Sequence, residues 1–449
     1  MSTYFINNIK NLGYQNSQKE KKIGKFFTQQ GNSIGSVAGS LYKSPTSSSI
    51  YSYGTSPVDY SSSNKNKQYG NYHYNNNNDL GSFYSQLSKN KDFSNSINPY
   101  SMDIDDKYYR KETNINDNNN NRELNSIITS IVGLTNLGNT CFMNTSLQIL
   151  IHSEDFIQRL LRESLDSRTT PISSKFYNLC REMGSSRGSS YITPSEFKQK
   201  FGSKHSLFRG YGQNDTQEFC RILLEDMNSE LNTVKYKPKY KELDTRNKDK
   251  RTCDKEFDYL FRSRESSIVM DSFYGQIINI FTCTCEYQTY SFQKILDLPL
   301  LMDNNNNIYD LLEEYFKDEK IMFETKCEKC GKKRTHLKET RISQPPNILI
   351  LSFQRINWRT KRKNSCSISF EEELDIKKFI DRDCGHRKEC RYTLYGIGNH
   401  SGNIDFGHYY AYIKLNDKTW YEFNDSTVRR IGYIDTNSKT VYTLFYKKQ

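Results

Sequence analysis

The sequence lacks the segments that direct a chain into or across a membrane. No run of 18 or more apolar residues occurs in the 449 residues, and the opening MSTYFINNIK does not have the pattern of a cleavable signal peptide. Crossing a bilayer takes about 20 consecutive apolar residues in a helix. We therefore expect no membrane partner and a cytoplasmic or nuclear location, or both.

The first quarter of the chain lacks cysteine and has little aliphatic periodicity. Residues 1–125 are rich in Asn, Ser and Tyr, with runs such as NNNND and NDNNNN. Such a segment cannot bury enough apolar surface to offset the entropy that is lost on folding. We predict a disordered tail over 1–129, unless short pieces fold on a partner, and a folded domain over 130–449.

Cysteine usage and charge limit the class of protein further. All 11 cysteines lie between Cys141 and Cys390, and their number is odd and their spacing uneven. These features are typical of an intracellular chain with reduced thiols.

The net charge of +12 is spread along the sequence, and its densest clusters are 331–338 and 358–364. Either cluster could touch nucleic acid, but a solvated loop is the simpler interpretation, so no nucleic-acid partner is expected.

Helical patterns come first in the chain and strand patterns follow. The run CFMNTSLQILI suits a helix with Asn139 or Thr140 as its N-cap, and 213–231 has apolar residues at helical spacing. The densely charged stretch 232–256 predicts a loop or hinge. From there the composition becomes β-rich, beginning with 267–283. This order predicts an α+β enzyme with two or more lobes.

One cysteine stands where a loop becomes a helix, in GLTNLGNTCFMNTSLQIL at 133–150. The unpaired N–H groups and the dipole of a helix N-terminus favour negative charge, so a thiolate there is stabilised and is a better nucleophile. A structural cysteine would instead lie on an apolar face as an inert hydrophobe. Cys141 is therefore a candidate nucleophile.

A predicted C-terminal hairpin, GHYYAYIKLNDKTWYEFNDS (407–426), supplies a candidate base. If its turn is centred on Asn416, His408 lies directly opposite Asn424 on the same face of the sheet. Asn424 would then orient the imidazole, as in a Cys-His-Asn site. A register slip of one residue would substitute Asp425. A lone histidine is more often structural, and the combination with a candidate thiol favours catalysis here.

Two cysteine pairs suggest a metal site. The first is Cys283 and Cys285 in FTCTCEY, and the second is Cys327 and Cys330 in CEKCGKK. Two such pairs can form a closed tetrahedral site, and C-x-x-C followed by Gly-Lys is a good zinc-knuckle signal, although C-x-C is less usual. We predict structural zinc. The alternative is four reduced cysteines in a β-rich lobe.

Together these motifs resemble the ubiquitin-specific protease family, papain-like cysteine deubiquitinases with palm, thumb and fingers. The first motif is similar to the family's cysteine box, GYGQNDTQEFCRILLEDM to its glutamine-containing box, GHYYAYIK and WYEFNDS to its histidine box, and VYTLFYKK to its last strand. The resemblance covers roughly 130–449 in the family's order. It implies a papain-like α+β fold with a helical thumb, a β-rich palm and zinc-ribbon-like fingers inserted at roughly 265–350.

The resemblance also implies catalytic roles. Cys141 would be the nucleophile, His408 the base and Asn424 the third member. Asn136, five residues before the cysteine, would donate a hydrogen bond to the oxyanion. Asp425 would support or replace Asn424.

Substrate and metal contacts follow from the same resemblance. Asp215 and Glu218 would face the basic tail of ubiquitin. Gly407 and Tyr409 would line the narrow channel for its terminal glycines. The four paired cysteines would hold zinc at the fingertips. No organic cofactor is implied, and the partners would be ubiquitin and ubiquitinated proteins.

The resemblance therefore implies a thiol-dependent deubiquitinase that hydrolyses the isopeptide or peptide bond after the C-terminal glycine of ubiquitin. Three alternatives remain open. One is a pseudoenzyme that binds ubiquitin without cleaving it, and another is an isopeptidase for a different ubiquitin-like modifier. The third is a nucleic-acid-binding zinc protein, which leaves Cys141, His408 and Asn424 unexplained.

Overall fold

The computed structural model describes residues 117–449, apart from 187–188, 303–305, 322–324, 358–361, 389 and 405. Nearly all of the predicted tail, 1–116, therefore lies outside the described residues. None of the helices in the described part is long and apolar enough to cross a membrane.

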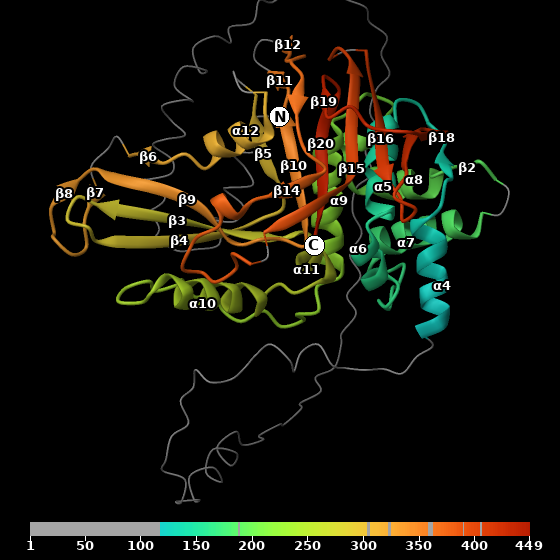
Figure 1. Ribbon diagram of the computed structural model, residues 1–449. Helices are drawn as coiled ribbons and strands as arrows, with labels where there is room; N and C mark the ends of the chain where they lie inside the picture. Colours follow the sequence, from blue (N-terminus) through green and yellow to red (C-terminus); the bar gives the residue numbers. More distant parts are fainter. Residues whose placement is uncertain are drawn as a thin grey trace, which may run out of the picture. The chain divides into compact units, whose positions relative to one another are not determined.

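Most helices come from the first half of the described chain and form one layer of the molecule (Figure 1). Two of them, α5 and α9, are joined by the edge-on contact of Phe142 with Phe219, whose ring centroids are 5.6 Å apart. The Thr216 hydroxyl also donates to the Phe142 carbonyl at 2.8 Å. The helices are α4 (Asp117–Ile128), α5 (Cys141–Ile151), α6 (Glu154–Leu160), α7 (Pro171–Ser185), α8 (Ser195–Lys204), α9 (Thr216–Glu230), α10 (Lys250–Arg262), α11 (Ile268–Phe273) and α12 (Ile308–Tyr315), with short 3-10 turns η1 (Ser206–Phe208) and η2 (Lys377–Phe379).

Helix α4 (Asp117–Ile128) corrects the predicted end of the tail at residue 129. Its residues Leu124, Ile127 and Ile128 recur at helical spacing and are all buried. Glu123 forms an ion pair with Arg181 of α7 at 2.6 Å. The Asn-rich composition concealed this short apolar stripe, because composition averages over the few positions that pack.

The large sheet carries the strands that matter for the site. Its order is β18-β17-β16-β15-β20-β10-β5, with β14 paired to β15. All of its pairings are antiparallel except that of β5 with β10. Helix α5 packs against β16 and β15. The strands are β5 (Leu298–Leu301), β10 (Ile348–Gln354), β14 (Glu373–Asp375), β15 (Arg391–Gly402), β16 (Gly407–Lys414), β17 (Trp420–Asn424), β18 (Thr427–Ile431) and β20 (Val441–Lys448).

A second sheet, the finger sheet, has the order β4-β3-β9-β6 and extends away from the helical layer (Figure 1). The small hairpin β7–β8 lies at its far end. The predicted finger interval of 265–350 contains this sheet, but it also contains β5 and α12, which pack with the large sheet. The strands are β3 (Gly275–Cys283), β4 (Gln288–Ile295), β6 (Glu319–Lys320), β7 (Thr325–Lys326), β8 (Lys333–Arg334) and β9 (His336–Gln344).

Three two-stranded pairings complete the described strands. The parallel pair β1–β2 lies next to the loop that precedes α5, and the other two pairs are antiparallel. They are β1 (Gly133–Leu134) with β2 (Tyr191–Ile192), β11 (Ile356–Asn357) with β12 (Arg362–Lys363), and β13 (Ile368–Ser369) with β19 (Asn437–Ser438).

The predicted α+β class is confirmed, with two local corrections. Ile268–Phe273, which we assigned to β-rich structure, forms helix α11. The Ser267 hydroxyl caps it by accepting a hydrogen bond from the Met270 N–H at 3.1 Å. The predicted loop over 232–256 ends earlier, because α10 begins at Lys250 with Asp249 as its cap.

Candidate functional site

Cys141 is the first residue of α5 and is 4 % exposed. In the loop before it, two consecutive residues have a left-handed backbone conformation, Gly138 at φ 94° and Asn139 at φ 54°. Glycine adopts this conformation without steric cost. The Asn139 amide then donates to the carbonyl of Tyr211 at 2.7 Å, which fixes the loop beside the segment before α9.

The N-terminus of α5 is not capped by a side chain. Thr140 precedes the helix, as predicted, but it makes no side-chain bond to the first turn. Its hydroxyl instead accepts from the Leu137 N–H at 2.8 Å. Asn136 Oδ1 accepts from the N–H groups of Gly138 and Thr140, both at 3.0 Å. The first-turn N–H groups of α5 thus keep their partial positive charge beside the thiol.

His408 brings the large sheet to the thiol. The interaction of its ring with the Cys141 side chain is the largest cause that raises the pKa of His408 to about 9. Its Nε2 donates to Asn424 Oδ1 at 2.8 Å, which raises the pKa further, while burial opposes both effects. Asp425 lies 3.9 Å from the same nitrogen. The imidazolium form is therefore favoured at neutral pH.

The hairpin register differs from the prediction. Ala411 pairs with Phe423 and Tyr412 with Glu422, so the turn is centred one residue later than we predicted. His408 is therefore not directly opposite Asn424. The shift in pairing is two residues, which preserves the face of the sheet, and the two side chains meet along a diagonal instead.

Asp425 connects two loops to the helix. Its backbone is left-handed at φ 51°. Its Oδ2 accepts from Asn136 Nδ2 at 2.9 Å, and its Oδ1 accepts from Asn144 Nδ2 at 2.8 Å. Its carbonyl accepts from the Leu134 N–H at 2.8 Å. Asp425 therefore aligns the loop of Asn136 as well as lying near His408.

Asn144 is a site residue that the sequence analysis missed. It is 2 % exposed and lies on the same face of α5 as Cys141, one turn later. Besides Asp425, its Nδ2 contacts the carbonyls of Leu134 and Thr135 at 3.1 and 3.3 Å. The available signal was a polar amide three residues after the thiol in an otherwise apolar helix.

Gly407 occupies a position without room for a side chain. A Cβ there would lie 1.9 Å from His400 Nε2. The Gly407 carbonyl accepts from Gln213 Nε2 at 3.2 Å, which joins β16 to the segment before α9. Tyr409, two residues on, is 5 % exposed, and its ring stacks on His400 with centroids 4.3 Å apart.

The two acidic residues predicted to face substrate differ in their surroundings. Asp215 is the N-cap of α9: its Oδ1 accepts from the N–H groups of Gln217 and Glu218 at 2.8 and 3.1 Å. Its Oδ2 accepts from the Tyr442 hydroxyl. Glu218 is half-buried, and burial together with the charge of Asp215 raises its pKa. Asp215 is thus held by hydrogen bonds within the protein, whereas Glu218 lies in the first turn of α9 and is only half-buried.

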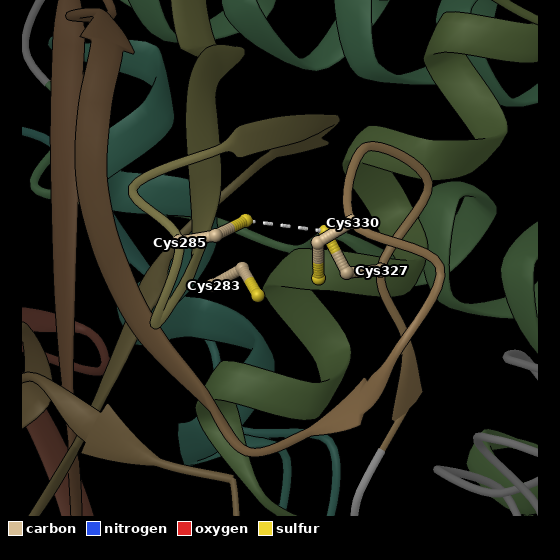
Figure 2. A group of neighbouring side chains, drawn as sticks. All are labelled: Cys283, Cys285, Cys327 and Cys330. Atoms are coloured by element: carbon tan, nitrogen blue, oxygen red, sulfur yellow. Dashed lines mark hydrogen bonds between the residues drawn. The ribbon is translucent and has the colours of Figure 1, made fainter.

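The four predicted metal ligands come together at the far end of the finger sheet. Their sulfurs all lie within 4.8 Å of one another, and Sγ of Cys285 and Cys327 are 3.6 Å apart. Figure 2 shows the four side chains pointing into one shared space from two separate turns. Tetrahedral zinc with Zn–S bonds of about 2.3 Å requires sulfurs about 3.8 Å apart. The residues therefore fit such an ion.

The turn that carries the second pair has the geometry expected of a knuckle. The N–H of Gly331 donates to the Cys327 carbonyl at 2.9 Å, and the N–H of Cys327 donates to the Lys332 carbonyl at 3.0 Å. Gly331 is left-handed at φ 68°. The glycine after C-x-x-C thus permits the tight reversal that brings both sulfurs to one side.

Comparison with known proteins identifies relatives for this arrangement. The family model described as ubiquitin carboxyl-terminal hydrolase matches residues 132–446. "Ubiquitin carboxyl-terminal hydrolase 2" of Bos taurus is 31% identical over 338 residues, covering 71% of this chain and 55% of that protein. "Ubiquitin carboxyl-terminal hydrolase 5" of Saccharomyces cerevisiae is 28% identical over 363 residues, covering 71% and 45%. The chain spans about half the length of these curated relatives.

Solved structures show the same fold. The SAGA DUB module of Ubp8, Sgf11, Sus1 and Sgf73 bound to monoubiquitin matches with a TM-score of 0.59 and 24% identity, covering 73% of this chain and 70% of that one. The same module bound to ubiquitin aldehyde gives a TM-score of 0.58 and 23% identity, with the same coverage. The helical layer, large sheet and finger sheet therefore form a fold shared with known proteins.

Proposed function

The chain belongs to the ubiquitin carboxyl-terminal hydrolase family, and on that premise we propose that it is a cysteine deubiquitinase acting on the bond after the C-terminal glycine of ubiquitin. The observation that carries the proposal is the grouping of Cys141, at the uncapped start of α5, with His408, which interacts with the thiol and is hydrogen-bonded to Asn424. It is a nucleophile–base–orienter arrangement beside backbone donors.

In the first step, the Cys141 thiolate attacks the carbonyl carbon of the terminal glycine, and the carbonyl electron pair moves to oxygen. The resulting oxyanion accepts hydrogen bonds from first-turn N–H groups of α5 and from Asn136. One Nδ2 hydrogen of Asn136 is donated to Asp425, and the second remains for the oxyanion.

The tetrahedral intermediate then collapses. The C–N bond breaks as the His408 imidazolium gives its proton to the leaving amine, and a thioester to Cys141 remains. Neutral His408 next takes a proton from water, the hydroxide attacks the thioester carbon, and the C–S bond breaks. Ubiquitin leaves with a free carboxylate, and the thiolate–imidazolium pair is restored.

The predicted substrate contacts belong to the same proposal. Glu218 and Asp215 would present negative charge to the basic tail of ubiquitin, and Gly407 would line the narrow channel for its terminal glycines. Tyr409 would form the floor of that channel together with His400, on which it stacks. We assign 130–449, together with the preceding helix α4, as the catalytic domain, with the four cysteines holding a structural zinc. The cytoplasmic or nuclear location stays a prediction.

The test is covalent capture of the full chain by ubiquitin that carries a C-terminal propargyl group. We expect labelling that is lost in Cys141→Ala and retained in Cys366→Ala, since Cys366 is an exposed thiol outside α5. Labelling that survives Cys141→Ala would overturn the assignment. A shift only with a probe built on another ubiquitin-like modifier would change the substrate, and ubiquitin binding without any shift would indicate a pseudoenzyme.

A further inference from the structure

We infer that Glu422 is a positioning residue whose carboxylate fixes the orientation of the Asn424 amide, and through it the His408 ring. This inference rests on the proposed function. Glu422 has no place in the triad as predicted, yet it is 5 % exposed, which is unusual for a carboxylate. A buried charge of this kind needs a reason and a partner.

The geometry supplies both. Glu422 and Asn424 are two residues apart on β17, so their side chains share one face of the sheet. Asn424 Nδ2 donates to Glu422 Oε1 at 3.4 Å. Arg429, the cross-strand neighbour of Glu422 on β18, donates to its Oε2 at 2.8 Å. The side chain of Arg429 is 66% exposed, whereas that of Glu422 is 7% exposed.

An asparagine needs such a neighbour because the two ends of its amide are nearly equal in shape. With Oδ1 toward His408, it accepts the Nε2 hydrogen; turned by 180°, it would present N–H groups to another donor. An ionised carboxylate can only accept hydrogen bonds. Glu422 therefore selects the orientation in which Nδ2 faces Glu422 and Oδ1 faces His408.

Arg429 keeps this selection in force. Its guanidinium, which can only donate hydrogen bonds, donates to Glu422 Oε2 at 2.8 Å. This charge-assisted bond holds the carboxylate in place, with Oε1 toward the Asn424 amide. The series His408, Asn424, Glu422 and Arg429 thus has an unambiguous donor and acceptor at every contact.

The test is a double-mutant cycle in the full chain, with ubiquitin carrying a C-terminal fluorogenic amide as substrate. In Glu422→Gln the new amide can donate or accept, so the orientation of Asn424 is no longer fixed. We expect kcat to fall about tenfold, within the range of coupling between contacting side chains. KM should stay within about twofold, because Glu422 lies behind the Asn424 side chain and contacts no residue predicted to bind substrate.

The matched control is Glu372→Gln. It removes an ion pair with Lys414 of the same sheet, and kcat should not change.

Rescue distinguishes positioning from mere stability. Asn424→Asp alone sets a second carboxylate against Glu422 and should lower kcat. The combination Asn424→Asp with Glu422→Gln restores an acceptor-only partner for His408, held by a Gln that donates. We expect this double variant to exceed both single variants in kcat. Additive losses would overturn the inference.

Two further measurements guard the inference. The first uses Arg429→Gln, which changes an exposed side chain and should therefore fold even if Glu422→Gln does not. We expect this variant to lower kcat by about two- to threefold. An unchanged kcat would contradict the series.

The second measurement separates this inference from the proposed function. If the unmutated chain hydrolyses no ubiquitin amide, the proposed function fails. The ¹⁵N resonances of the His408 ring would then still decide the inference, because they must change in Glu422→Gln and not in Glu372→Gln.

Discussion

The two thiol sites of this chain are held in place by opposite means. Cys141 lies on a helix in which all residues are buried, and the helix packs against other helices and the large sheet. Cys285 and Cys330 are half-buried at the end of a sheet, beside a hairpin with two residues in each strand. Cys141 belongs to a hydrophobic cluster of the core, whereas none of the four paired cysteines belongs to either cluster in the described part of the chain.

The difference shows what each kind of site requires. A nucleophile must have its geometry before substrate arrives, so its neighbours are fixed by packing and by hydrogen bonds across distant segments. Structural metal ligands can be carried by short turns, because the metal itself supplies the cross-link and its binding energy is folding energy. The predictions below test this contrast, beginning with the largest effect.

Removing the proposed oxyanion donor, Asn136, should damage the first site most. Asn136→Ala should lower kcat by about 10²–10³, the usual loss for one such donor, with little change in KM. Asn139→Ala is the matched control: it lies on the same loop, binds the carbonyl of Tyr211, and should cost much less. Steady-state kinetics with a fluorogenic ubiquitin amide measure both. Equal losses in the two variants would mean that the loop's conformation, and not the donor, matters.

Removing metal should loosen the second site and leave the first intact. We expect one zinc per chain by elemental analysis, lost on chelation and reduced in Cys330→Ser but not in Cys366→Ser. Chelation should then speed amide exchange at Cys327 and Gly331 by at least about tenfold, since local opening would be about 1.4 kcal/mol easier. Alkylation of Cys141 by iodoacetamide should keep its rate. An equal change at both sites would show that they are not independent.

The same contrast explains what could be predicted from the sequence. Local signals were sufficient where chemistry depends on neighbours in the chain, as with the thiol at the start of α5 and the glycine after C-x-x-C. The N-cap of α9 could also be predicted, because Asp215 directly precedes a clear helical pattern. Such features need no knowledge of the tertiary fold.

Features that depend on pairing between segments were predicted less well. The register of β16 and β17 differed by two residues, because the turn residues fit more than one centre. Asn144 and Glu422 were missed, although each lies on the same face as a predicted site residue, three or two positions away. Their importance comes from Asp425 and Asn424, which meet them only in the folded chain.

The smallest expected effect concerns the pH dependence of the first site. His408 has its pKa raised from 6.5 to about 9, so its imidazolium persists as the pH rises and is lost through about pH 9. The rate of labelling by the propargyl probe should therefore fall on an alkaline limb near that value. Any stability that this protonation gives should be complete below pH 6.5 and disappear over the same interval.

Asn424→Ala should move this limb downward, because the hydrogen bond it removes favours the charged ring. A neutral hydrogen bond contributes about 0.5–1.5 kcal/mol, and one pKa unit corresponds to about 1.4 kcal/mol, so the shift should be roughly half a unit to one unit. Treatment with a chelator, which would remove the proposed zinc, should not shift the limb. A limb that moves upward in Asn424→Ala would show that the amide stabilises the neutral ring, and that the proton stays on His408 for a reason other than its partner on β17.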